Sequence, residues 1–173
     1  MPRTYCENAP HNPIQALYHS TEYGFPVTDE RVLFERLCLE IMQAGLSWDI
    51  VLKKRKPLNK AFHQFHPTKI AAYKAKDIKR LMADAGIIRN RLKITAIIEN
   101  ARIVLDMRKT HGGFAKWLDA QYPRSKQAWV KLFKKTFKFT GGEITGEFLK
   151  SIGLLPGAHW KGCEVYKRLM SQK

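Results

Sequence analysis

The sequence is poor in acidic residues, and this deficit is its strongest compositional signal. Of its 173 residues, 15 are Asp or Glu and 31 are Lys or Arg, which gives a formal net charge of +16. A surplus of this sign favours a polyanionic partner, with nucleic acid ahead of an anionic membrane surface. The alternative at this point is a basic protein that binds no polyanion.

Cysteines and long hydrophobic runs are also scarce. Three cysteines are an odd number and do not suggest a disulfide framework, so metal binding is the better use for a cysteine that has a partner. The first residues, MPRTYCENAPHNP, lack the apolar segment of a secretory signal. No run approaches the ~18 apolar residues that span a bilayer. We therefore expect a cytoplasmic protein that does not enter a membrane.

Alternating strand patterns with hairpin turns are absent, whereas hydrophobic residues recur at helical spacing along most of the chain. We predict an all-α fold, with 45% hydrophobic and 11% aromatic residues to form its core. Residues 1–28 are expected to be irregular, Pro57 is expected to break a helical region, and Gly86 is expected to end a helix in a left-handed conformation. The predicted helical segments are 29–45, short pieces around 58–65 and 68–75, 77–86, about 89–107, 114–121, 125–136 and 144–152. Gly112 and Gly113 are expected to end the region that begins at about residue 89.

The pattern favours a single domain over residues 1–173. Within it, residues 29–108 form a helical core that carries a hairpin at about 77–107. Residues 1–28 and about 110–173 can pack together as a separate lobe, because both lie outside that core in the sequence.

Two Cys-His pairs lie at opposite ends of the chain. His159 and Cys163 stand four residues apart in GAHWKGC, and Cys6 and His19 stand thirteen apart near the N-terminus. Together they make a Cys2His2 set, which suits a tetrahedral structural zinc ion with no open position. Histidines are common in this sequence, so chance placement of ordinary residues is the alternative. Cys38 falls on the apolar face of a predicted helix, and we assign it to core packing.

An acidic residue interrupts the apolar run LCLEIMQAGLSW. Glu40 must either emerge on the polar side of its helix or lie in a pocket with a partner, because an unpaired buried charge is unfavourable. Gln43 lies one turn further along, and Gly45 turns the chain so that Trp48 follows closely. This grouping suits a planar, cationic or hydrogen-bonding ligand. The alternative is a solvent-facing Glu and a core Trp.

The stretch LMADAGIIRNRLKITAIIENA predicts two helices joined by a tight turn at Gly86. In such a hairpin the backbone N–H groups at the start of the second helix can bind a phosphate. Arg89, Arg91 and Lys93 add positive charge at the same place. We expect a sequence-independent, salt-sensitive contact with a nucleic acid backbone.

Several segments resemble the 3-methyladenine DNA glycosylase I family of helix-hairpin-helix base-excision repair enzymes. They are ALYHSTEYGFP together with the preceding Cys6, LFERLCLEIMQAGLSWDIVLKKR, AGIIRNRLKI and HWKGC, in the family's order over nearly the whole chain. The resemblance implies an all-α fold in which one structural zinc ion joins the N- and C-terminal segments. It places the metal ligands on Cys6, His19, His159 and Cys163.

The resemblance also implies an activity. It makes the chain a monofunctional hydrolase that releases 3-methyladenine from alkylated double-stranded DNA, leaves an abasic site and needs no lysine nucleophile. Such an enzyme is a monomer in the bacterial cytoplasm, associated with DNA. Glu40 is then the catalytic and base-recognising residue, Trp48 stacks on the flipped purine, and Tyr18 and Tyr23 line the pocket.

Two side chains at the helix end, Gln43 and Leu46, are plausible fillers of the gap that the flipped base leaves in the duplex. Gly86, Arg89, Arg91 and Lys93 complete the expected DNA-binding set.

Part of the sequence departs from the family pattern. Asn8 and Gln15 stand where the family has pocket aromatics. In FTGGEITGEF, Glu143, Gly146 and Glu147 replace threonine, tyrosine and serine. These changes predict a wider and more polar wall on one side of the base pocket. Two alternatives therefore stay open: a non-catalytic DNA-binding paralogue, and a glycosylase with another base preference.

Overall fold

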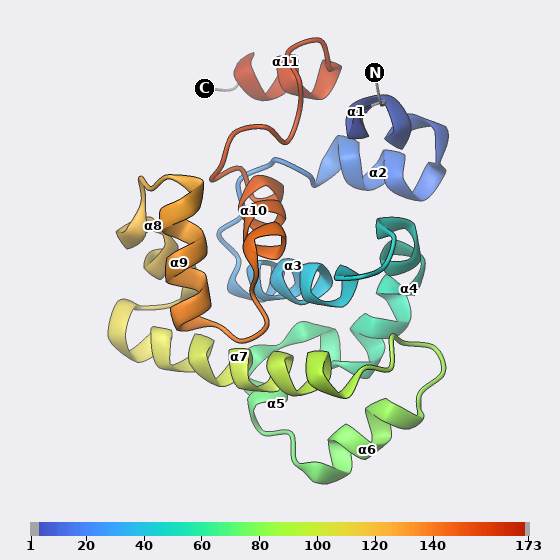
Figure 1. The fold of residues 1–173 in the computed structure, drawn as a ribbon, viewed down its shortest axis with the longest axis vertical. Helices are drawn as coiled ribbons and strands as arrows, with labels where there is room; N and C mark the ends of the chain where they lie inside the picture. The colour runs from blue at the N-terminus through green and yellow to red at the C-terminus, as the bar shows by residue number, and fades with distance from the viewer. Residues whose placement is uncertain (1–3, 172–173) are drawn as a thin grey trace.

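The computed structural model describes residues 4–171, and over that range it is helical throughout, with no β-strand (Figure 1). This confirms the predicted all-α class. The α-helices are α1 Tyr5–Asn8, α2 Pro13–Thr21, α3 Glu30–Gln43, α4 Trp48–Ala61, α5 Pro67–Ala71, α6 Ala75–Ala83, α7 Arg91–His111, α8 Phe114–Gln121, α9 Lys126–Thr136, α10 Gly142–Ser151 and α11 Glu164–Ser171. Two short 3-10 helices are η1 Ala9–His11 and η2 His63–Phe65. Within the described part of the chain, no helix has the length and apolarity needed to cross a membrane.

Helix α3 lies at the centre of the molecule. Every residue from Leu33 to Met42 is buried, so this helix is surrounded on all sides by protein. It packs against α4, α7, α8 and α10. The Asp29 side chain caps its first turn by accepting a hydrogen bond from the Val32 amide at 2.9 Å. Any polar side chain in the middle of α3 is therefore held in a fixed place.

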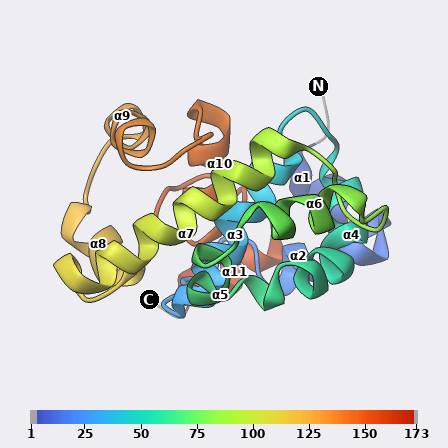
Figure 2. The same cartoon turned by 90° about the horizontal axis from the view of Figure 1, so that it is seen from below.

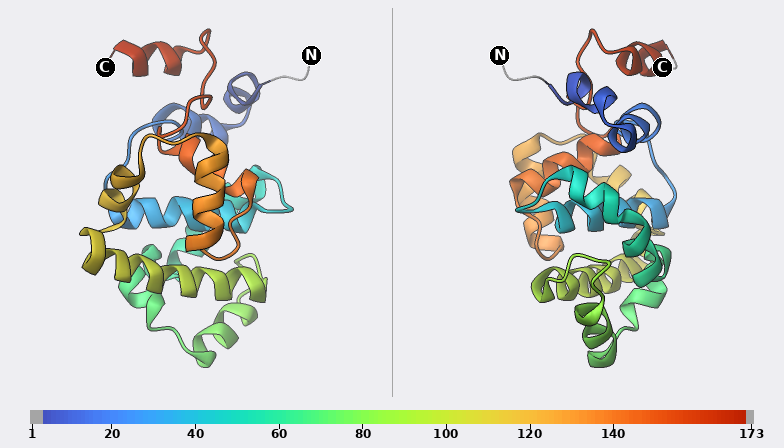
Figure 3. Two further views of the ribbon diagram at one scale, coloured as in Figure 1. Left: turned by 60° about the vertical axis from the view of Figure 1, so that its left-hand side comes forward. Right: turned by 90° about the vertical axis from the view of Figure 1, so that its right-hand side faces the viewer.

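The remaining helices form layers around α3. Helix α10 packs on α3 and α9 packs on α10, while α5 and α6 pack on α7. Seen from below, α7 crosses the molecule and ends beside α8 (Figure 2). Helices α1 and α11, from the two ends of the chain, lie at the same end of the molecule in both views of Figure 3. The fold therefore brings the two Cys-His pairs toward one region.

The prediction that residues 1–28 are irregular was wrong, because α1, η1 and α2 lie there. The prolines start these helices and do not interrupt them. Pro13 is the first residue of α2, and the Asn12 side chain accepts a hydrogen bond from the Ile14 amide at 3.1 Å. Proline is favoured at the first helical position, where its missing N–H would have no partner in the helix.

The predicted break at Pro57 was also wrong, because α4 continues through it to Ala61. Proline removes the hydrogen bond to the carbonyl of Lys53, but that residue is exposed, so water can take the place of the lost donor. Leu58 is fully buried and Ala61 nearly so, and their packing holds the last turn in place. Tertiary burial thus outweighs the local penalty.

Two further boundaries differ from the expectation. Helix α6 ends at Ala83, and Gly86 does not adopt a positive φ; instead, its amide donates to the Asp84 carboxylate at 2.8 Å. Helix α11 was not predicted. The expected ends at Gly112 and in the segments 114–121, 125–136 and 144–152 agree with α7, α8, α9 and α10 to within two residues.

Candidate active site and metal centre

A cavity of about 500 Å³ lies between α1, α2, the end of α3, the start of α4, α10 and the segment before α11. It brings together Glu40, Gln43, Trp48, Tyr18 and Tyr23, all predicted from the sequence. Residues from the ends of the chain complete its wall. The full lining is Thr4, Tyr5, Cys6, Tyr18, Tyr23, Glu40, Gln43, Trp48, Glu147, Lys150, Gly157, Ala158, His159 and Trp160.

Glu40 is the acidic group at the bottom of this cavity. It is 5% exposed, which excludes the alternative of a solvent-facing carboxylate. No described residue donates a hydrogen bond to its carboxyl group, which lines the cavity without a direct partner. Burial, with the negative charge of Glu147, raises the pKa of Glu40 to about 8, although Arg36 and Lys150 oppose this shift. The raised pKa means that the ionised form of Glu40 lacks compensating charge within the protein, and a ligand that carries positive charge can supply it.

Aromatic rings form the sides of the cavity. The ring centroid of Trp48 lies 5.2 Å from that of Tyr18, and Tyr18 lies 5.9 Å from Tyr23. Tyr5 stands edge-on to Tyr23 with a centroid distance of 5.3 Å. Because Trp48 is only half-buried while Tyr18 and Tyr23 are buried, one face of the indole is accessible from the cavity. These rings can hold a flat ligand by stacking.

An ion-pair network holds the Tyr18 hydroxyl group in place. Arg36, 3% exposed, donates to the Tyr18 hydroxyl at 3.1 Å and to Glu22 at 2.8 Å. Arg55 then bridges Glu22 and Glu35 at 2.8 and 2.9 Å. The network fixes the orientation of Tyr18 because each charged group in it has a partner. Sequence reasoning missed it, since its members are spread over α2, α3 and α4.

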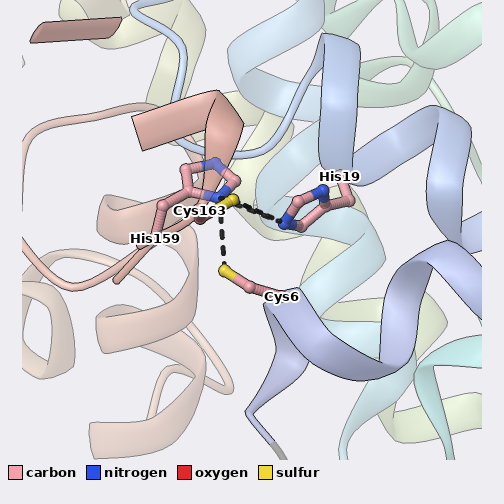
Figure 4. Close-up of side chains that lie close together, drawn as sticks. All are labelled: Cys6, His19, His159 and Cys163. Atoms are coloured by element: carbon pink, nitrogen blue, oxygen red, sulfur yellow. Dashed lines mark hydrogen bonds between the residues drawn. The ribbon is translucent and has the colours of Figure 1, made fainter. Parts of the chain in front are cut away.

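Figure 4 shows that the side chains of Cys6, His19, His159 and Cys163 lie close together. Two of them, Cys6 and His159, also line the cavity. The possible ligand atoms of all four residues lie within 4.8 Å of one another. The His159 Nδ1 atom is 3.2 Å from His19 Nε2 and 3.5 Å from Cys6 Sγ, and Cys163 Sγ is 3.7 Å from His19 Nε2. The four side chains form a compact set of two nitrogen and two sulfur donors that can hold a metal ion.

The surroundings of these four residues favour ligation. His159 Nε2 lies 2.7 Å from the Tyr23 carbonyl oxygen, so this nitrogen carries the proton and Nδ1 presents its lone pair to the cluster. Burial lowers the pKa of His19 and of His159, which keeps both rings in the neutral form that binds metals. Cys38, by contrast, is fully buried in the main core, as predicted.

The turn between α3 and α4 stands at the mouth of the cavity. Gly45 adopts φ +79, and the Gln43 side chain donates to the Leu46 carbonyl at 2.8 Å. Leu46 is only half-buried. Gln43 lines the cavity and Leu46 lies beside it in the turn, so both are close to where a base would enter.

The hairpin between α6 and α7 exposes Arg89 and Arg91. Asn90 caps α7 by accepting from the Lys93 amide at 3.1 Å. Lys54, from α4, donates to the Gly86 carbonyl at 3.1 Å and holds the turn in place. The hairpin therefore offers two free cations next to a helix start.

Lys93 is a correction to the predicted DNA-binding set. It is 4% exposed, and its ammonium donates to the carbonyls of Met42 at 2.8 Å and of Ala44 at 2.5 Å. These carbonyls belong to the C-terminal end of α3 and have no partner within that helix. Lys93 thus caps α3 from α7 and is not available to a phosphate.

Comparison with known proteins agrees with this geometry. The sequence model of the methyladenine glycosylase family matches residues 8–127. The chain is 40% identical over 180 residues to DNA-3-methyladenine glycosylase 1 of Escherichia coli strain K12, covering 93% of this chain and 96% of that protein. The chain belongs to the methyladenine glycosylase family.

Other relatives support the same assignment. DNA-3-methyladenine glycosylase of Haemophilus influenzae is 39% identical over 157 residues, which cover 80% of this chain and 85% of that protein. A crystal structure of 3-methyladenine DNA glycosylase I superposes with a TM-score of 0.83 at 40% identity, covering 92% of this chain and 97% of that one. A structure of 3-methyladenine DNA glycosylase I from Staphylococcus aureus, described as showing the basis of 3-methyladenine recognition, superposes with a TM-score of 0.80 at 32% identity. The match covers 90% of this chain and 92% of that one.

Of the residues Asn8, Gln15, Glu143 and Glu147, which depart from the family pattern, only Glu147 lines the cavity. Asn8 is exposed, and neither it nor Gln15 is among the residues that line the cavity. Glu143 is exposed as well, whereas Glu147 lines the cavity. Tyr5 and Lys150 line it too, and sequence reasoning missed both. Tyr5 directly precedes Cys6 in the sequence, and Lys150 follows Glu147 by one helical turn. These two positions are the only sequence signals that could have pointed to Tyr5 and Lys150.

The buried carboxyl group of Glu40 predicts a pH-dependent stability. Its pKa is higher in the folded state than the usual 4.5, so the folded protein holds its proton more tightly and loses stability as pH rises from about 4.5 to about 8. Glu40→Gln removes this loss. We expect the variant to gain on the order of 3 kcal/mol over the wild type between pH 5 and pH 8. Urea denaturation of both proteins across this range, at equal metal content, measures the difference; parallel curves would contradict it.

Proposed function

We propose that this chain is a monofunctional DNA-3-methyladenine glycosylase of base-excision repair. The observation that carries the proposal is Glu40, a buried carboxyl group without a hydrogen-bond donor that faces a cavity walled by aromatic rings. Its relatives from two bacteria carry the name of this activity. We further propose that it acts as a monomer on damaged double-stranded DNA.

The chemistry of the substrate fits this cavity. Methylation at N3 gives the adenine a positive charge, and the lesion must leave the base stack before its glycosidic bond can be reached. The Glu40 carboxylate selects the cation over neutral adenine, and Trp48 stacks on the flipped ring. Tyr18 and Tyr23 limit its position. Gln43 and Leu46 fill the space that the base leaves in the duplex.

The reaction is a hydrolysis. The bond between the base and C1′ of the sugar breaks, its electron pair leaves with the base, and the base departs uncharged. Water supplies the oxygen that bonds to C1′ and loses one proton to the solvent, so an abasic site remains. Lys150, the lysine that lines the cavity, is ion-paired with Glu147, and Lys93 is bonded to two carbonyls. Neither amine is free to attack C1′, which supports a monofunctional enzyme.

An excision assay on alkylated duplex DNA tests this function. We expect release of free 3-methyladenine, reduced about 100-fold or more in Glu40→Gln because the charge opposite the cation is lost. In Trp48→Ala, the rate of 3-methyladenine release should fall about tenfold because the stacking contact with the base is missing. Glu143→Gln, an exposed acid on α10, is the matched control and should keep full activity.

Other outcomes of this assay point to the two alternatives. DNA binding without release of any base would contradict the proposal and favour a non-catalytic paralogue. Release of a different methylated base in preference to 3-methyladenine would indicate altered specificity.

We propose that Cys6, His19, His159 and Cys163 bind one structural zinc ion, because two thiolates and two imidazoles suit tetrahedral zinc and leave no open position. Purified protein should contain about one equivalent of zinc by elemental analysis. Cys163→Ser should lose the metal and about 3 kcal/mol of stability, because the two chain ends are no longer joined. Cys38→Ala is the control and should keep the metal. Metal-free wild-type protein with unchanged stability would contradict the assignment.

We also propose that the hairpin binds the DNA backbone through Arg89, Arg91 and the amides near Gly86. Arg89→Ala should weaken binding to all DNA sequences alike and reduce the slope of log K against log salt by about one. Fluorescence anisotropy at several salt concentrations measures both effects. Lys109→Ala, at the far end of α7, serves as the control. A loss restricted to particular sequences would rule out a phosphate contact.

A further inference from the structure

The α10 wall of the cavity carries an ion pair that the reaction does not use. Glu147 is ion-paired with Lys150, one turn further along the helix, and accepts a hydrogen bond from the Tyr23 hydroxyl at 3.0 Å. The side chain of Glu147 is 36% exposed, and that of Lys150 is 25% exposed. Both line the same cavity as Glu40. Glu147 is thus held by two partners, while Glu40 has none among the described residues.

Lys150 lines the same cavity as two acidic residues. Glu40 and Glu147 are the only carboxylates among the described residues that line the cavity. On its other side Lys150 borders a second hollow, where Arg124 and Lys126 add only positive charge. Of these two acids, Glu147 is the one with which the Lys150 ammonium is ion-paired.

Lys150 already acts on Glu40 from its present place, since it lowers the pKa of that carboxyl group while Glu147 raises it. The other charged or titratable groups around Glu40 are Arg36 on α3, Tyr18 on α2, Tyr5 and Cys6 on α1, Tyr23 before α3, and His159 before α11. Of the cationic side chains in this set, Arg36 is committed to Tyr18 and Glu22. Lys150 is the one whose partner can change.

We propose that Glu147 is a positioning residue that binds Lys150 and so keeps the Glu40 carboxylate free for a cationic base. The inference rests on the proposed function, because it assigns the positive charge opposite Glu40 to the substrate. Without Glu147, Lys150 pairs with Glu40 and supplies that charge itself. The pocket then has no anion left with which to prefer a methylated purine.

A pair of variants tests this role. Glu147→Gln keeps the size of the side chain and a hydrogen-bond acceptor for Tyr23, but releases Lys150. We expect its kcat/KM for 3-methyladenine excision at pH 7 to fall about tenfold or more. The double variant Glu147→Gln/Lys150→Met should regain activity to within about threefold of the wild type, because the competing cation is gone. Glu143→Gln on the same helix is the matched control.

The pH profile gives a second readout. In Glu147→Gln, the ionisation of Glu40 should move to lower pH, since a negative neighbour is lost and a positive one comes closer. The rise of kcat/KM with pH should shift in the same direction while its plateau falls. The double variant should recover the plateau. A residue that only supports the fold would lower the plateau without shifting the profile, and removal of Lys150 would not rescue it.

The outcomes separate this inference from the proposed function. Wild-type protein that releases no 3-methyladenine contradicts the function itself. An active wild type together with a fully active Glu147→Gln overturns the positioning role alone. So does a double variant that is no more active than Glu147→Gln, with thermal unfolding used to confirm that both variants are folded.

Discussion

The carboxyl group of Glu40 lies in the last turn of α3, within the stretch from Leu33 to Met42 in which every residue is buried. A charge in such a place is unfavourable unless its surroundings or a ligand compensate for it. The structure gives Glu40 no direct partner among the described residues; instead it surrounds it with aromatic rings, a paired Arg36 and the Glu147–Lys150 pair. In the proposed function, the stability that is given up at this position is the source of the selectivity for a cationic base.

The cluster of Cys6, His19, His159 and Cys163 shapes the same cavity, and the zinc ion proposed there has a structural role. His19 follows Tyr18 directly in α2, and His159 binds the backbone of Tyr23 through its second ring nitrogen. Cys6 and His159 themselves line the cavity. A metal ion held by these four residues would join the two ends of the chain and so fix Tyr18 and Tyr23, two of the three tyrosines that line the cavity. A closed, four-ligand site suits this role, since it provides rigidity and leaves no position open for substrate.

Two lysines connect the hairpin between α6 and α7 to the helices beside the cavity, one to α3 and the other to α4. Lys93 caps the end of α3 from within α7, and Lys54 holds the hairpin turn from α4. The Gln43 to Leu46 turn and the hairpin that carries Arg89 are consequently fixed relative to one another. In the proposed function, a DNA backbone bound at the hairpin would therefore be held in a fixed position relative to the cavity that takes the flipped base.

The sequence by itself determined the helical class, most helix ends after residue 110, and the residues that matter most. Helical periodicity, capping residues and the left-handed Gly112 are local properties, and so they can be read locally. The Cys-His spacing and the acid in an apolar run pointed to the metal cluster and to Glu40, because such residues are rarely placed there without a partner or a ligand. Resemblance to the glycosylase family then supplied the chemistry.

Only the tertiary structure decided how the charged residues are used. Arg89, Arg91 and Lys93 look alike in the sequence, yet two are exposed and the third caps a buried helix end. Pro57 lies inside a helix because residues distant in sequence bury the next turn. Glu147 and Lys150 acquire their role from Glu40, more than a hundred residues away in the chain. The energy of a charge depends on its burial and on its neighbours, and both are set by long-range packing, which local sequence does not contain.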